Sequence, residues 1–313
     1  EGTKILLNYK PEYAEKTKFN IHMDMVGGGL ETKGVYQVSR GPMSLPSFIN
    51  DVGESFGEFL NQSSIAYASG TATKFPVVSK EGGKEPLQAI IGNTNYDSPS
   101  NIDPTVLKRS GFIGAASAYY LANFTTKDLA PLSNLMKQRV LQRAYAMLNF
   151  SYAFNAEERE NAKYYFWQQE VQAFNSIKPF ADVSEQTKDY KAYLESLQST
   201  IGPGKPLVNL DENNLIVYSR EEGLKGGMLS FGYDYFRDHY PANKPQPKLL
   251  NFNALRGNGA EYGYETLNLV NSKHSISDIR NILSAQFGPI PIAIVSEYLE
   301  ALESIKVITV ADN

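Results

Sequence analysis

The residues best suited to chemistry lie close together near the start of the chain, between positions 20 and 29. An aspartate, Asp24, comes near the carboxyl end of an apolar strand candidate and is followed by three glycines at 27–29. Open α/β sheets present ligand-binding side chains at the carboxyl ends of their strands, and carboxylates bind divalent cations. The pattern therefore fits a metal ligand, although an aspartate that caps a turn gives the same pattern.

A histidine, His22, lies two residues before Asp24. Side chains two positions apart in a strand lie on the same face of a sheet, so His22 is a candidate second ligand. Two ligands do not complete a tetrahedral zinc site, and the alternative is a histidine packed beneath neighbouring helices.

Composition excludes several classes of protein. The 313 residues include no cysteine, which removes disulfides, thiolate metal sites and cysteine nucleophiles. The 30 basic and 34 acidic residues give a net charge of −4, so we expect no nucleic-acid partner. No apolar run approaches the ~18 residues that span a bilayer, so we expect no membrane span. The chain begins with Glu1 and contains 20 tyrosines, from which we expect a processed or fragmentary N-terminus and an exported, extracytoplasmic protein.

The N-terminal part, residues 1–124, alternates strand and helix signals in the way that is typical of α/β domains. Strand candidates cover 17–26, 34–39 and 86–91. Ser47 suits the N-cap of one helix, and Pro104 suits the first turn of another. We therefore predict a sheet with helices packed against it.

Three further segments follow this α/β part. Residues 125–202 carry apolar residues at helical spacing and predict two or three long helices. Residues 203–259 are a β-rich, aromatic linker region, and residues 260–313 predict three helices and a final strand, similar to a small winged-helix domain. The candidate surface-binding residues of the linker region are Tyr233, Tyr235 and Phe236.

Several stretches, in order, resemble the M28 family of zinc aminopeptidases. They are residues 9–16, 20–29, 40–51 and 93–123, and the tail at 264–289 resembles the PqqD-like winged-helix domain found on some of these proteins. The resemblance implies the C-terminal half of a zinc-exopeptidase sheet in which Asp24 is a metal ligand. It also implies peptide hydrolysis by a water activated between two zinc ions.

The chain departs from this family at the metal site. Only 23 residues precede Asp24, so the family's upstream histidine, bridging aspartate and general-base glutamate are not in this chain. The family's last zinc-binding histidine falls on Asn93, and an amide binds zinc more weakly than imidazole does. Gly82, Gly83, Glu85 and Asp97 are what remains of the loops around the former site.

These departures lead to two expectations about function. The first is a non-catalytic binding or structural subunit, a pseudoenzyme whose open sheet edge is covered by a protein partner or a second copy. The second is the C-terminal part of a split or processed aminopeptidase, which would bind zinc only when another chain supplies the missing ligands. The winged-helix tail adds the idea of a peptide partner bound by strand addition.

Overall fold

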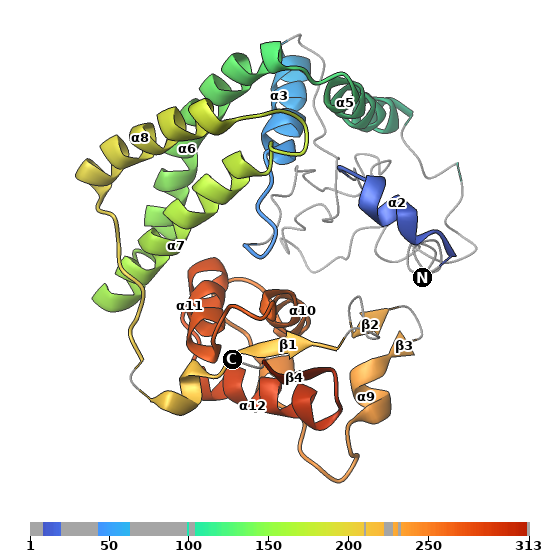
Figure 1. Cartoon of the computed structure of the whole chain (residues 1–313), viewed down its shortest axis with the longest axis vertical. Helices are drawn as coiled ribbons and strands as arrows, with labels where there is room; N and C mark the ends of the chain where they lie inside the picture. The colour runs from blue at the N-terminus through green and yellow to red at the C-terminus, as the bar shows by residue number, and fades with distance from the viewer. Residues whose placement is uncertain are drawn as a thin grey trace, which may run out of the picture.

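The computed structural model describes residues 9–19, 43–62, 99, 104–209, 211–221, 228–230 and 233–311. The described part is mainly helical and carries two small two-stranded sheets (Figure 1). Most of the predicted N-terminal strands lie outside the described residues. Of the strand predicted at 17–26, only 17–19 are described, and they belong to no regular element.

The described residues form several long helices and a number of shorter helices and strands. The longer helices are α3 (Ile49–Gln62), α5 (Pro104–Ala122), α6 (Leu129–Ser151), α7 (Ala156–Asn175), α8 (Ser184–Ile201), α10 (Gly259–Leu269), α11 (Ile276–Phe287) and α12 (Ile292–Ser304). The shorter elements are α2 (Pro11–Lys16), α9 (Tyr235–His239), β1 (Tyr218–Arg220), β2 (Leu229–Ser230), β3 (Tyr233–Asp234) and β4 (Ile308–Val310).

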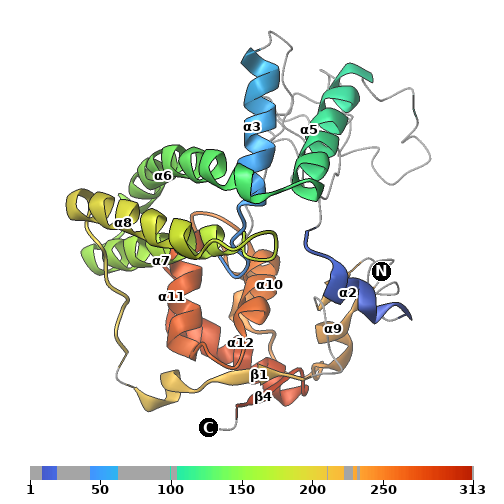
Figure 2. The ribbon, with the colours of Figure 1, turned by 45° about the horizontal axis from the view of Figure 1, so that its top comes forward.

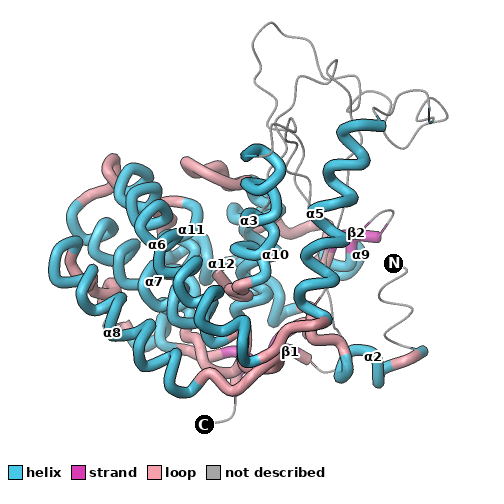
Figure 3. Tube along the Cα trace, turned by 90° about the horizontal axis from the view of Figure 1, so that it is seen from above, coloured by secondary structure: helices cyan, strands magenta, loops and turns pink. Residues whose placement is uncertain are grey.

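The long helices predicted between 126 and 200 are confirmed as α6, α7 and α8, which pack against one another side by side (Figure 3). The side chain of Asn155 caps α7 by accepting a hydrogen bond from the backbone N–H of Glu158 at 2.9 Å. Helix α8 ends at Ile201 and is followed by Gly202, whose φ of 98° suits a residue without a Cβ. Their shared core includes Phe48, Met136, Val140, Trp167, Phe174 and Tyr190.

The C-terminal part forms a second core around α10, α11 and α12. Strand β1 pairs antiparallel with β4 in the register Tyr218↔Val310, and the carbonyl of Tyr218 accepts a hydrogen bond from the backbone N–H of Ser272 at 3.1 Å. The strand predicted at the end of the chain and the three helices before it are therefore confirmed as elements. Core residues here include Tyr262, Leu267, Ile279, Leu283, Val295, Leu299 and Leu302.

Helix α7 lies against α11, so the two cores are joined (Figure 2). Buried Asn161 of α7 donates from Nδ2 to the carbonyl of Asn281 at 2.9 Å, and Asn281 donates to the carbonyl of Leu207 at 2.9 Å. Arg280 of α11 also forms an ion pair with Glu158 of α7. Because the buried side chains of Asn161 and Asn281 are hydrogen-bonded across this contact, they fix how the helices meet.

The connection after α8, predicted as a linker, runs back along α7. The N–H of Lys205 donates to the carbonyl of Glu160 at 3.1 Å. At Gly204, with φ of 70°, a Cβ would lie 2.4 Å from that same carbonyl oxygen. The glycine is therefore required by the close approach of two backbones.

No single helix among the described residues is long and apolar enough to cross a membrane; α11 and α12 meet the length and composition criteria only as a pair, bent by 119°.

We expect Asn161→Ala to lower the free energy of unfolding by about 1–3 kcal/mol, because it leaves buried partners at the α7–α11 contact without a hydrogen bond. Urea unfolding followed by the fluorescence of Trp167, the single tryptophan of the chain, measures the change. Gln172→Ala, at an exposed position of the same helix, is the matched control and should change stability by less than about 0.5 kcal/mol. Equal effects of the two variants would show that the contact does not hold the helices.

Candidate functional site

The residues predicted at the former metal site and its loops cannot be placed, since they lie outside the described residues. They are His22, Asp24, Gly82, Gly83, Glu85, Asn93 and Asp97. Within the part of the chain that the structure describes, no group of three or more histidine, aspartate or glutamate side chains is arranged to hold a metal ion. The zinc-ligand assignments therefore stay predictions.

The aromatic candidates of the linker region do not form one exposed surface. Tyr233 lies in β3, whereas Tyr235 and Phe236 begin α9. The side chain of Phe236 is 4% exposed and packs in the C-terminal core, 5.8 Å from Tyr298 between ring centroids. The prediction of a surface role for Phe236 is wrong in this respect, because the turn into α9 directs its ring inward.

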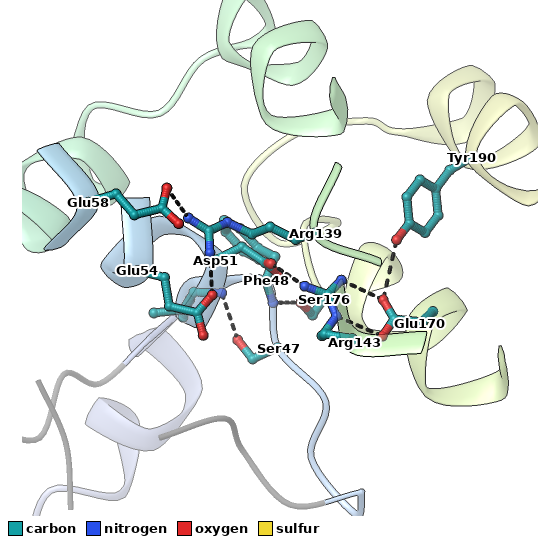
Figure 4. Close-up of polar contacts among 11 residues, drawn as sticks. Ser47, Phe48, Asp51, Glu54, Glu58, Arg139, Arg143, Glu170, Ser176 and Tyr190 are labelled. Carbon is teal, nitrogen blue, oxygen red and sulfur yellow. Dashed lines mark hydrogen bonds and ion pairs between the residues drawn. The ribbon is translucent and has the colours of Figure 1, made fainter. Parts of the chain in front are cut away.

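A charge network that the sequence analysis missed lies where α3, α6 and α7 meet (Figure 4). Arg143 of α6 binds Glu170 of α7 through two parallel hydrogen bonds, Nε to Oε1 at 2.9 Å and Nη2 to Oε2 at 2.6 Å. Its third nitrogen, Nη1, donates to Oδ1 of Asp51 in α3 at 2.6 Å. The hydroxyl of Tyr190, on α8, donates to Oε2 of Glu170 at 3.4 Å.

A second arginine extends this network one helical turn earlier. Arg139 of α6 forms ion pairs with Glu54 and Glu58 of α3 (Figure 4). The two arginines are four residues apart, and the three acidic residues of α3 are three and four apart. Each set therefore lies along one face of its helix, and the two faces meet.

The electrostatics of the network suit a clamp between helices. Asp51 and Glu170 are buried, and burial alone would lower the pKa of the Arg143 guanidinium. The charges of Glu170 and Asp51 outweigh that effect and raise the pKa above its ordinary value, so Arg143 stays protonated. A permanently charged, fully engaged guanidinium holds elements together and is not suited to proton transfer.

A short segment before α3 joins the bundle to the C-terminal core. The backbone N–H of Ser44 donates to Oε1 of Glu265 at 2.9 Å, and the hydroxyl of Ser44 donates to Oε2 at 2.7 Å. The N–H of Met43 donates to Gln286 at 2.9 Å, and the N–H of Phe48 donates to Oγ of Ser176 at 3.0 Å. Burial raises the pKa of Glu265, and the two bonds from Ser44 oppose that shift.

The outer face of α6 is unlike the rest of the bundle surface, because it carries no charged side chain. Its exposed residues, continued to the C-cap, are Ala130, Pro131, Asn134, Gln138, Leu141, Gln142, Tyr145, Ala146, Leu148, Asn149 and Tyr152. The three charged residues of the helix, Lys137, Arg139 and Arg143, all form ion pairs with other helices. By contrast, the exposed residues of α8 include Glu185, Lys188, Asp189, Lys191 and Glu195.

Comparisons with protein-family models, curated proteins and solved structures returned no match.

We expect Arg143→Met to lower the free energy of unfolding by about 3–5 kcal/mol, because Asp51 and Glu170 would remain buried without a cation. Lys137→Met is the matched control on the same helix. Its partner Asp189 has a side chain that is 67% exposed, so its loss should cost less than about 1 kcal/mol. Urea titrations of both variants give the comparison, and similar losses would contradict a clamping role for Arg143.

The raised pKa of Glu265 predicts a pH dependence of stability. The folded protein holds this proton more tightly than the unfolded chain, so the associated stability is present below the unfolded pKa. It is lost as the pH rises through the raised folded value. Glu265→Gln removes the titration and can keep both contacts, since the Ser44 hydroxyl also accepts a hydrogen bond. We therefore expect the urea midpoint of the variant to vary less than that of the wild type between about pH 4 and pH 7.

The matched control for this test is Glu195→Gln, at an exposed position of α8. It should retain the pH profile of the wild type. An unchanged profile in Glu265→Gln would mean that the buried carboxyl does not set the dependence.

Proposed function

We propose that this chain is a non-catalytic, protein-binding subunit whose N-terminal part is similar to an M28 peptidase with an incomplete metal site. The observation that carries the binding role is the outer face of α6. Leu141, Tyr145, Leu148 and Tyr152 are all exposed there, in a face without charge. A contiguous apolar surface of this kind is typical of a place where another protein packs.

The incomplete metal site supports the non-catalytic part of the proposal. Asn93 replaces the family's last histidine, and Asp24 is the one family ligand that the motifs retain in this chain. The acidic residues that the structure brings together, Asp51, Glu54 and Glu170, are engaged by arginines. Their geometry supports a structural role rather than a catalytic one.

The C-terminal module supports a protein partner rather than a nucleic acid. Three helices followed by a strand that pairs with β1 fit the winged-helix expectation. In such domains the third helix reads DNA, but here α12 carries Glu297, Glu300 and Glu303 and no basic residue. Three carboxylates would repel a phosphate backbone.

Zinc content and peptidase activity of the full chain test this proposal. After incubation with zinc chloride and dialysis, we expect less than one zinc per chain and no hydrolysis of leucine p-nitroanilide. Asp24→Ala should change neither result, and Asp211→Ala, at an exposed aspartate, is its control. Two zinc ions per chain together with hydrolysis that Asp24→Ala abolishes would contradict the proposal and support a peptidase.

The split-peptidase alternative predicts a different outcome. In that case zinc uptake and hydrolysis would appear only when a second polypeptide carrying the upstream histidine, aspartate and glutamate is added.

A further inference from the structure

We propose that the outer face of α6 binds the same face of a second copy of this chain, with the two helices antiparallel. The inference rests on the proposed binding function and names its partner.

The spacing of the face is that of a coiled-coil seam. Six of the exposed residues follow one another at intervals of four and three: Asn134, Gln138, Leu141, Tyr145, Leu148 and Tyr152. These are the positions of a heptad repeat that line up along one side of a helix. The buried side of α6 carries a separate apolar stripe that faces α7 and α8, so this outer seam has no role in the bundle core.

The charge of the face favours an identical partner. A partner with a charged surface would lose hydration here without gaining an opposite charge, because every exposed residue of α6 is neutral. A second α6 brings neither a like-charge repulsion nor an unpaired charge. The amides of Asn134 and Gln138 can also bond to tyrosine hydroxyls of the other copy.

Antiparallel pairing makes the seam self-complementary. If the two-fold axis passes near Arg143, Leu141 of one copy lies opposite Tyr145 of the other, and Asn134 lies opposite Tyr152. Each aromatic ring then packs beside an aliphatic or amide group. The helix dipoles also oppose one another in this orientation, which is the favourable one.

The area of the seam is enough for a weak dimer. Tyr145 is 69% exposed and Tyr152 is 80% exposed. At about 200 Å² for a tyrosine, the two rings offer about 300 Å² per copy. With the leucines and neutral flanks, the face reaches about 500 Å² per copy, or about 1,000 Å² for the pair. That total is near the lower limit for a specific interface, so we expect a dimer that dissociates in the micromolar range.

Sedimentation equilibrium of the full chain between about 1 and 100 µM tests the proposal. The wild type should pass from monomer to dimer in this range. Tyr145→Glu should weaken the dimer at least tenfold, because each copy would then bury a carboxylate against Leu141 of the other copy with no cation to pair with it. Ala192→Glu, at an exposed position of α8, is the matched control and should leave the dimer unchanged. A urea titration confirms that Tyr145→Glu is folded.

Cross-linking tests the orientation, and the chain is suited to it because it has no cysteine of its own. With a short bis-maleimide, Gln142→Cys should link to itself, since it lies next to the axis. Asn134→Cys and Tyr152→Cys should each fail alone and should link when the two variants are mixed. Self-linking of Tyr152→Cys would overturn the antiparallel arrangement.

The outcomes separate this inference from the proposed function. A wild type that is monomeric at about 100 µM, or a dimer that Tyr145→Glu leaves intact, overturns the second copy as the partner. Either result leaves the zinc and peptidase results standing. Conversely, a dimer with two zinc ions and peptidase activity would support the pairing and contradict the non-catalytic role.

Discussion

The guanidinium of Arg143 sits between two buried carboxylates, and its position determines how three helices meet. Asp51 comes from α3, and Glu170 comes from α7, so one side chain of α6 satisfies both. Neither carboxylate would be stable in this place without the cation, because the cost of removing a charge from water is large. The way in which α3, α6 and α7 meet therefore depends on the geometry of this one guanidinium group.

The two cores are held together by contacts of the same kind on a smaller scale. Between α7 and α11, Asn161 donates a hydrogen bond to the carbonyl of Asn281, and Asn281 donates to the carbonyl of Leu207. Ser44 donates to the buried Glu265 of α10. In each of these contacts, a buried polar side chain is hydrogen-bonded to a residue from a distant part of the chain. Such contacts add specificity to the apolar packing, which alone would tolerate sliding of one helix on another.

Local sequence signals predicted the helices between 104 and 201 and the elements of the tail, but not how these elements assemble. Helical periodicity and Pro104 indicated α5 to α8, and the serine, proline and β-branched residues of the tail indicated α11, α12 and β4. The charge network was missed although Arg139 and Arg143 show helical spacing, because Asp51 lies 92 positions from Arg143. Only the crossing of α3 over α6 brings them together. Alternation at 233–236 likewise could not show that α9 begins at Tyr235 and turns Phe236 inward.

The backbone contact between Gly204 and α7 has a consequence for any assembly that this chain enters. Since the segment after α8 is pressed against Glu160 and fixed through Leu207, it cannot act as a swivel. A partner that binds the helical bundle is thus held in a fixed orientation relative to the sheet of β1 and β4. Gly204 therefore adds to the α7–α11 contacts in setting the spacing between two attachment points on this protein.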